Sequence, residues 1–438
     1  MKPGPANIVL VTAHDIGRYL GAYGVNCNHS PALDNFADDA ICLTNFHSAA
    51  PQCSPSRAAF ATGLYPHATG VLGICSEQFG FDMDKPERHI ARMLGGAGYR
   101  TAGMGVAHET INPQAVFDRY EKTLDADAIA SKASEYLFDV SRRGRPFFLQ
   151  VGFRQAHRPF EDVPYDEYGV EVPPWLADTP PIRYELAAMQ GAIRRMDRCV
   201  GEILQALDKN NLKDRTLVVF AADHGLPFAR AKHSLYEPGC EAAAIIRFPE
   251  RNWRGGHRVD CLVSGVDLFA TLLDAAGVAP PDGIQGVNIA PVLDGSTTSV
   301  RDYVFTEQTY HAYLDCSRAV RDTRYKLIAN FSPGRAFFDS SQSWRPKGDV
   351  RFVDDPMRTH HPPIELYDLQ NDPLEQSNLA TSAACSEIMS RLKGVLLKWM
   401  QDTDDPLLNG IPIPPIYWRA MRALSADGAS NEHRRDKR

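Results

Sequence analysis

The residues best suited to chemistry lie in segment 53–57, which reads Cys-Ser-Pro-Ser-Arg. Proline favours the first turn of a helix, so the segment predicts a helix with Ser54 as its N-cap and Gly63 at its end. Cys53 would then lie at the helix N-terminus, where free N–H groups and the positive end of the dipole attract anions. Arg57 follows one turn later and adds a cation. A nucleophile beside an anion site predicts sulfuryl or phosphoryl transfer, although a buried free cysteine on a capped helix would leave the same pattern.

Four short apolar segments end abruptly in polar residues and read as buried parallel strands. They are Asn7–Thr12 before His14 and Asp15, Thr101–Met104 before His108, Pro146–Val151 before His157 and Arg158, and Thr216–Phe220 before Asp223 and His224. Between them, apolar residues near the 3.6-residue period predict helices over Arg88–Ala97, Tyr184–Leu207 and Val266–Ala276. This alternation predicts an α/β fold with a large, mostly parallel sheet flanked by helices. Ligands of such sheets bind beyond the carboxyl ends of the strands, so the polar residues should converge on one crevice.

The last third of the chain has a different pattern. Residues Arg318–Ile328 alternate with period 2 and predict one charged strand, and Glu365–Leu369 predicts another. An amphipathic helix is expected over Met389–Met400, and a loop over Phe331–Pro363. We therefore expect a catalytic domain over 1–315 and a smaller antiparallel-sheet-plus-helix subdomain over 316–425. The polar residues 426–438 should form a frayed, disordered tail.

Composition excludes several classes of protein. The 438 residues are 44% hydrophobic and 23% charged, which is typical of a globular chain and unlike a disordered, coiled-coil or fibrous one. With 47 basic and 54 acidic residues, the net charge of −7 lacks the basic excess of a dedicated nucleic-acid binder. No apolar run is long enough to span a membrane.

The cysteines and the N-terminus bear on the compartment. Nine cysteines without paired spacing predict mostly free thiols and therefore a reducing environment. The first ten residues lack a basic-then-apolar leader. We expect a cytoplasmic protein, or a periplasmic one if a leader has been removed.

The segment from Cys53 to His67 resembles the signature of the type I sulfatases of the alkaline phosphatase superfamily. The resemblance continues through Asp223–Gly225, Lys232, Tyr236–Gly239 and Glu365–Leu379. Within that family the chain is most similar to the N-sulfoglucosamine sulfohydrolases (sulfamidases) and their bacterial relatives, on Gly21–Tyr23, His157-Arg158, Arg195–Asp197 and Thr403–Pro406. The resemblance implies an alkaline phosphatase-like fold. It also implies that a maturation enzyme oxidises Cys53 to formylglycine, whose hydrate attacks sulfur and then releases sulfate.

The resemblance places a divalent metal on His14, Asp15, residue 53, Asp223 and His224. The family often has an acidic pair where this chain has His14-Asp15, so His14 is either a direct ligand or a neighbour that hydrogen-bonds beside the metal. Oxygen-rich sites favour Ca²⁺ or Mg²⁺, and imidazole shifts the preference toward Mn²⁺ or Zn²⁺. We expect Ca²⁺ from the resemblance, with Mn²⁺ and Mg²⁺ as alternatives.

The resemblance also implies the remaining roles. Arg57 and Lys232 would cradle the sulfate, and His157 would face the leaving group. Arg158, Glu307 and His311 are predicted to contact substrate.

One departure concerns the family tetrad G-K-x-H, which here reads Gly105-Val106-Ala107-His108. His108 is kept as a predicted site residue, but the lysine is replaced by Val106. Losing one transition-state donor typically costs a factor of about 10²–10³ in rate.

Three functions remain open at the level of the sequence. The first is a sulfatase that cleaves a sulfate ester or sulfamate from a small sulfated substrate, with N-sulfoglucosamine as the first candidate sugar. The second is a phosphodiester or phosphonate monoester hydrolase of the same superfamily, with which Asp223-His224 is compatible. The third is a non-catalytic anion- or carbohydrate-binding relative, against which the intact C-x-P-x-R argues. We expect no nucleic-acid or membrane partner, and a homo-oligomer is left open.

Overall fold

The strand β1 (Asn7–Ala13) lies in the middle of an eight-stranded sheet and is buried along almost its whole length. The computed structural model describes residues 5–27, 29–311, 313–334, 351 and 360–424. The sheet order is β5 (Arg119–Glu121), β4 (Arg100–Gly105), β6 (Phe147–Gly152), β1, β7 (Thr216–Ala222), β8 (Ala244–Arg247), β2 (Ile41–Leu43) and β9 (His257–Val259). Only β8 runs antiparallel to its neighbours. The predicted mostly parallel α/β sheet is confirmed, and its four predicted strands are β1, β4, β6 and β7.

The register of the central strands brings their carboxyl ends to one level. Ala13 lies opposite Ala222, and Thr12 lies opposite Gly152. Gly152 in turn lies opposite Gly105. A Cβ on Gly105 would lie 2.2 Å from the Gly152 carbonyl oxygen, so only glycine permits this close approach. Residues that follow these strands therefore start from the same edge of the sheet.

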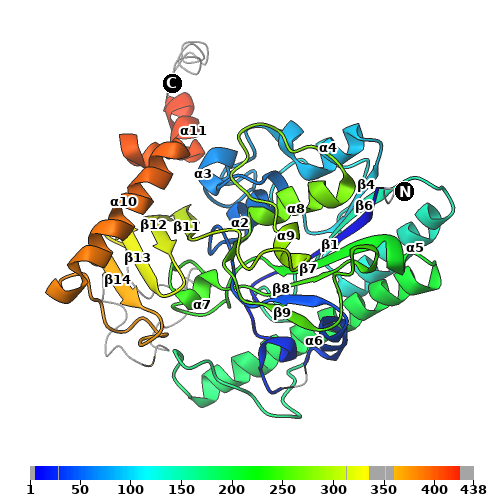
Figure 1. Ribbon diagram of the computed structural model, residues 1–438, viewed down its shortest axis with the longest axis horizontal. Helices are drawn as coiled ribbons and strands as arrows, with labels where there is room; N and C mark the ends of the chain where they lie inside the picture. The colour runs from blue at the N-terminus through cyan, green and yellow to red at the C-terminus, as the bar shows by residue number, and fades with distance from the viewer. Residues whose placement is uncertain (1–4, 28, 312, 335–350, 352–359, 425–438) are drawn as a thin grey trace.

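Helices cover both faces of this sheet (Figure 1). The helices α2, α4 and α8 contact one another on one face, and on the other face α1 and α5 each contact α6. The buried side of α6 carries the apolar residues that predicted it, such as Leu186, Met189 and Ile193. The helices on these faces and in the connections are α1 (Pro31–Asp38), α2 (Cys53–Thr62), α3 (Pro66–Thr69), α4 (Ile90–Gly96), α5 (Ala126–Ser141), α6 (Pro180–Lys209), α7 (Glu237–Cys240), α8 (Asp267–Ala276) and α9 (Ala290–Leu293). A two-stranded ribbon joins β3 (Phe46–His47) to β10 (Val263–Ser264).

A second, antiparallel sheet lies beside the first (Figure 1). Its strands are β11 (Val304–Tyr310), β12 (Leu314–Arg321), β13 (Tyr325–Asn330) and β14 (Ile364–Asp368). The helix α10 (Ser386–Asp402) packs on it through a shared apolar cluster. The helix α11 (Pro415–Leu424) follows at the C-terminal end of the described chain.

The single charged strand predicted over Arg318–Ile328 is wrong. The segment forms parts of two strands, β12 and β13, joined by a turn. Asp322 makes the turn, because its Oδ1 accepts hydrogen bonds from the backbone N–H groups of Arg324 and Tyr325. A side chain that satisfies backbone donors in this way offers the chain an alternative to the strand ladder.

The division of the chain into domains stays a prediction. The predicted boundary after residue 315 falls within β12, which pairs with β11. Most of the predicted loop over Phe331–Pro363, and the predicted tail 426–438, lie outside the described residues.

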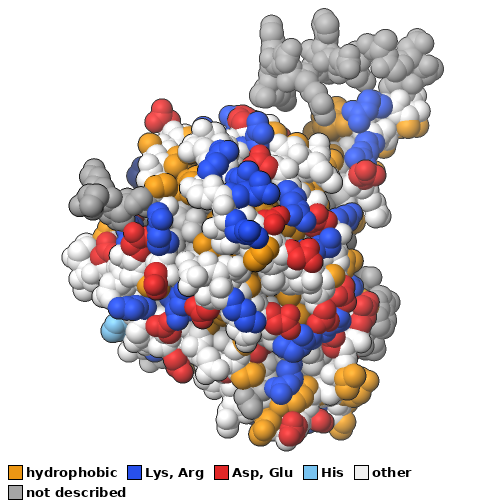
Figure 2. Space-filling view, turned by 90° about the vertical axis from the view of Figure 1, so that its right-hand side faces the viewer, with side chains coloured by type: hydrophobic (Ala, Val, Ile, Leu, Met, Phe, Trp, Pro, Cys, Tyr) orange, Lys and Arg blue, Asp and Glu red, His pale blue; other side chains and the backbone are white. Residues whose placement is uncertain are grey.

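Charges of both signs are interspersed over the face of the molecule in Figure 2. One example joins α5 to α6, where Arg195 pairs with Asp125 and Asp127. Among the described residues, no helix combines the length and apolar character needed to cross a bilayer.

Buried ion pairs hold the second sheet in place. Arg318 on β12 is fully buried and donates from Nε and Nη2 to the carboxylate of Asp405, at 2.6 and 3.0 Å. Removing one partner of such a pair leaves an uncompensated buried charge. The sequence pattern gives no sign of this pair, because its members are 87 residues apart.

We predict that Arg318→Met lowers the free energy of unfolding by about 3–5 kcal/mol, because Asp405 loses its buried partner. Urea denaturation followed by circular dichroism measures the change. The control is Arg324→Met, which removes a more exposed partner of Asp368 and should leave the denaturation midpoint nearly unchanged. Equal shifts for both variants would contradict a special role for the buried pair.

Candidate active site

Cys53 is the first residue of helix α2, and Gln52 is the N-cap. The prediction that Ser54 is the N-cap is wrong. The Ser54 hydroxyl accepts a hydrogen bond from the Cys75 N–H at 3.0 Å instead. The helix ends as predicted at Gly63, which adopts the left-handed conformation with φ of 68°. The Cys53 side chain thus lies at a helix N-terminus, as the sequence indicated.

Two buried carboxylates stand at the ends of the neighbouring strands β1 and β7. Asp15 and Asp223 are both fully buried. The Asp15 backbone N–H donates to Asp223 Oδ1 at 3.0 Å, which ties the two strand ends together. Asp15 has φ of 57°, a left-handed conformation that costs a non-glycine residue roughly 1–3 kcal/mol. The turn holds the carboxylate at the crevice despite this cost.

Each carboxylate is held by a predicted cation. Lys232 Nζ donates to both oxygens of Asp15, at 3.0 and 2.8 Å. Arg57 Nε donates to Asp223 Oδ2 at 3.0 Å. All four side chains are essentially inaccessible to solvent. The structure therefore brings Lys232 into the same site as Arg57, although the two residues are far apart in sequence.

Two imidazoles complete a set of oxygen and nitrogen donors. His14 Nδ1 lies 3.1 Å from Asp223 Oδ2. His224 Nε2 lies 3.2 Å from Asp15 Oδ1 and 3.5 Å from Asp223 Oδ1. Within the described part of the chain, neither ring nitrogen has a partner in hydrogen-bond geometry. Buried nitrogens left unsatisfied beside carboxylates fit a divalent cation, which both kinds of donor would bind.

The charges in the site reinforce one another. Burial opposes ionisation of Asp223, but His224, His14 and Arg57 hold its pKa well below the ordinary carboxyl value. Burial likewise opposes ionisation of Asp15, but the charge on Lys232, followed by His157 and His224, lowers the pKa of the Asp15 carboxyl. Both carboxylates are therefore ionised at neutral pH and able to bind a cation.

The Cys53 thiol is ionised more easily than an ordinary thiol. Burial would raise its pKa, but the charge on Lys232 and contacts from His108, His14 and His224 lower it well below the usual value. His311 also contacts Cys53. This contact favours a higher pKa of the His311 imidazole, but burial has the larger effect and lowers that pKa.

His157 also lies at the site, with its ring centroid 5.4 Å from that of His14. Its Nδ1 donates to the Arg158 carbonyl oxygen at 2.5 Å, which leaves Nε2 as the free ring nitrogen. The charge on Lys232 and then burial lower the pKa of His157 to about 4. The imidazole is neutral at pH 7 in the absence of bound groups.

Two predicted substrate residues have other partners. Arg158 pairs with Glu185 and donates from Nε to the Pro227 carbonyl oxygen at 2.8 Å. Glu307 accepts from the His67 backbone N–H at 2.6 Å and contacts the His67 ring. Their contact with substrate stays a prediction, whereas His311 lies at Cys53.

Sequence reasoning missed two residues that position the site. Thr12 Oγ1 accepts a hydrogen bond from Arg57 Nη1 at 2.8 Å. The Ser56 hydroxyl donates to the Asp223 backbone oxygen at 2.5 Å and so joins α2 to β7. A polar residue inside a buried strand is the one signal that could have pointed to Thr12.

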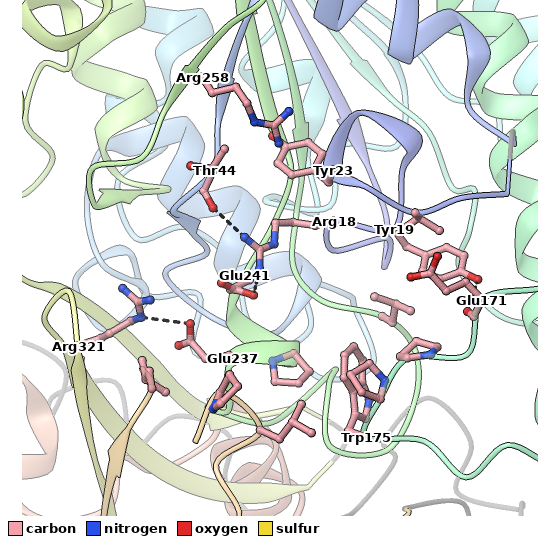
Figure 3. A pocket seen from close by; sticks show the side chains of 18 residues that line it. Arg18, Tyr19, Tyr23, Thr44, Glu171, Trp175, Glu237, Glu241, Arg258 and Arg321 are labelled. Atoms are coloured by element: carbon pink, nitrogen blue, oxygen red, sulfur yellow. Dashed lines mark hydrogen bonds and ion pairs between the residues drawn. The ribbon is translucent and has the colours of Figure 1, made fainter. Parts of the chain in front are cut away.

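Two cavities lie near this region. One of about 420 Å³ is lined by Val106, His108 and Lys122 among others, and it reaches the site through His108. The other, of about 460 Å³, contains none of the predicted site residues. Figure 3 shows it between Trp175 and the ion pairs of Glu237 with Arg321 and Glu241 with Arg18. Of these two cavities, the first is the one that borders a predicted site residue, His108.

Comparison with known proteins gives consistent matches along the chain. The sulfatase family model matches residues 6–278, and a model described as "N-sulphoglucosamine sulphohydrolase, C-terminal" matches residues 224–344. Human N-sulphoglucosamine sulphohydrolase is 28% identical over 468 aligned positions, covering 92% of this chain and 91% of the human protein. An ulvan-active sulfatase of Formosa agariphila is 27% identical, covering 96% of this chain and 85% of its own.

Solved structures share the fold. A protein in complex with its substrate D-glucosamine-2-N,6-O-disulfate superposes with a TM-score of 0.71 and 19% identity, over 92% of this chain and 98% of that one. Ps i-CgsB in complex with k-i-k-neocarrahexaose superposes with a TM-score of 0.73 and 21% identity, over 96% and 98%.

We predict that Lys232→Met raises the pKa of the Cys53 thiol, because the charge that most favours the thiolate is removed. In the cysteine form, thiolate absorbance near 240 nm is titrated against the Cys53→Ser variant, with metals chelated. The parent should keep Cys53 ionised well below an ordinary thiol pKa of about 8.5. In Lys232→Met the titration should move to higher pH.

The control for this titration is Lys122→Met, which changes an exposed lysine on the wall of the cavity at His108. Its titration should match that of the parent. An unchanged titration in Lys232→Met would show that Lys232 does not set the ionisation of Cys53.

Proposed function

The chain belongs to the sulfatase family, whose model covers more than half of it, and we propose that it hydrolyses the N-sulfate or O-sulfate of an amino sugar. The observation that carries the proposal is the pairing of Arg57 with Asp223 and of Lys232 with Asp15 around the Cys53 helix N-terminus. A nucleophile position, an anion-binding helix end and two buried cations are the parts that sulfuryl transfer needs.

Residue 53 supplies the nucleophile in this proposal. The formylglycine that the family forms from this cysteine supplies, as its hydrate, one hydroxyl for attack and a second for release of sulfate. Arg57 and Lys232 stabilise the charge that develops on the sulfate oxygens. Thr12 keeps the Arg57 guanidinium in place through its 2.8 Å hydrogen bond.

Asp15, Asp223, His14 and His224 would hold the divalent metal. A metal bound there neutralises the charge of sulfate and of the nucleophile. Calcium, which the resemblance implies, and manganese, which two imidazoles favour, are separated by metal analysis of the purified chain. His14 and His224 bring nitrogen donors to both carboxylates, so we propose His14 as a direct ligand.

His157 would protonate the leaving group through Nε2, since its Nδ1 is engaged by the Arg158 carbonyl. It would take up this proton when the anionic substrate offsets the charge of Lys232, which lowers its pKa in the free chain. His108 lines the neighbouring cavity and is the second candidate for this role.

The sugar is proposed from the relatives and from the cavity. Human N-sulphoglucosamine sulphohydrolase matches along most of both chains. The cavity of about 420 Å³ adjoins His108, and among its described lining residues Lys122 is the sole cation. We therefore propose a small sulfated sugar as substrate, with N-sulfoglucosamine tested first.

A phosphodiester or phosphonate monoester hydrolase is the second candidate function. It is favoured by Asp223-His224 and by the imidazoles that stand beside both carboxylates. Assay of an aryl sulfate and an aryl phosphodiester on one preparation separates the two functions. Binding of sulfated sugar without turnover would instead indicate a non-catalytic relative.

We predict that protein from a host with the maturation enzyme carries formylglycine at residue 53. Mass spectrometry of the peptide containing it should show a loss of about 18 Da, the difference between the two residues, and Cys53→Ala should abolish sulfatase turnover. The control Cys199→Ala changes another buried cysteine, which lies in α6 away from the cavity at His108, and should keep turnover. Turnover that survives in Cys53→Ala would overturn the proposal.

We further predict that His157→Ala slows release of poor leaving groups selectively. A general acid contributes a factor of about 10²–10⁴, so kcat for a sugar sulfate should fall far more than kcat for 4-nitrophenyl sulfate. The same comparison in His108→Ala tests the second candidate acid. Equal losses on both substrates would assign His157 a structural role.

A further inference from the structure

Four imidazoles lie around the Cys53 sulfur. His14, His108, His224 and His311 all contact it. Across the described residues, one ring nitrogen of each of these four histidines has no hydrogen-bond partner: Nδ1 of His14, His108 and His311, and Nε2 of His224. Buried polar atoms are nearly always paired, so four such nitrogens beside one sulfur are available to bind a ligand.

Two of these histidines, together with the Cys53 sulfur, are already arranged as a ligand set. Ligand atoms of His14, Cys53 and His108 all lie within 4.8 Å of one another. In a tetrahedral zinc site, Zn–S of about 2.3 Å and Zn–N of about 2.0–2.1 Å place the donor atoms roughly 3.3–3.7 Å apart. Small side-chain rotations would close the remaining gap. The His14 and His108 rings, with centroids 5.6 Å apart at 69°, can both turn a nitrogen toward one point.

We propose that, when Cys53 is not converted, its thiolate together with His14 and His108 binds a thiophilic divalent cation such as Zn²⁺. Cysteine and histidine are the ligands that zinc prefers, and His311 stands beside the sulfur as a further donor. On binding, the thiol sulfur forms the bond to the metal and its proton passes to solvent; no oxidation occurs. This site does not rest on the proposed sulfatase function.

The new donor set differs from the oxygen-rich one, although His14 belongs to both and the resemblance assigns residue 53 to the oxygen-rich set as well. The other set joins His14 to Asp15 and Asp223. Sulfur and imidazole select zinc-like ions, whereas carboxylates also accept calcium and magnesium. The chemical state of residue 53 would thus decide which kind of ion the crevice holds.

Cobalt titration tests the proposal, because Co²⁺ replaces Zn²⁺ and reports thiolate ligation by a sulfur-to-metal charge-transfer band in the near ultraviolet. The full chain is produced without the maturation enzyme and stripped of metal by chelation. We expect the band to form with one equivalent of Co²⁺ and to disappear when Zn²⁺ displaces it. Cys53→Ser should lose the band, and His108→Ala should lose it or require much more Co²⁺.

The matched control is Cys75→Ser, which removes a buried cysteine that contacts the same helix and should keep the band. Circular dichroism checks that each variant is folded. Binding of Co²⁺ without the band, or a band that persists in Cys53→Ser, would overturn the thiolate site. Neither result bears on the proposed sulfatase function, which is tested on protein whose Cys53 has been converted to formylglycine.

Discussion

Burial of two carboxylates side by side is the constraint on which the rest of the site depends. Asp15 and Asp223 end adjacent strands, and neither has access to solvent. Uncompensated, such charges would cost several kcal/mol each. Lys232 compensates the charge of Asp15, and Arg57 compensates the charge of Asp223. Because Arg57 belongs to α2, its ion pair also holds the first residue of that helix, Cys53, at the crevice. The anion site at Cys53 is therefore a consequence of how the carboxylates are neutralised.

The second sheet supplies cations that pair with a buried acidic residue close to Lys232. Five residues after Lys232 the chain enters α7, where Glu237 pairs with Arg321 at 3.1 Å and with Lys326 at 2.9 Å. Figure 3 shows the first of these pairs among the residues that line the cavity of about 460 Å³. Because both partners belong to the second sheet, that sheet anchors the segment that carries Lys232. The crevice is thus assembled by both sheets, although most of its residues come from the first.

The same crevice can serve more than one ion chemistry. Its carboxylate side suits the metal that sulfatases use, and its imidazole-and-sulfur side suits a softer ion. His14 lies between the two sides. His14 directly follows β1, and the register of β1 with β7 fixes the strand end from which it projects.

The sequence by itself determined the strands that end in His14-Asp15, His108, His157 and Asp223-His224, since continuous apolar runs stop where polar residues begin. It also determined that a helix begins close to Cys53, but it put the N-cap at Ser54, whereas Gln52 is the cap and Cys53 the first helical residue. The Ser54 hydroxyl accepts instead from the Cys75 N–H, a contact that no local pattern records. Only the tertiary structure decided that Arg158 and Glu307 have ion-pair partners, that Thr12 holds Arg57, and that four imidazoles surround one sulfur. Local patterns report backbone preference and burial, whereas the partner of a charge depends on segments that fold together from distant parts of the chain.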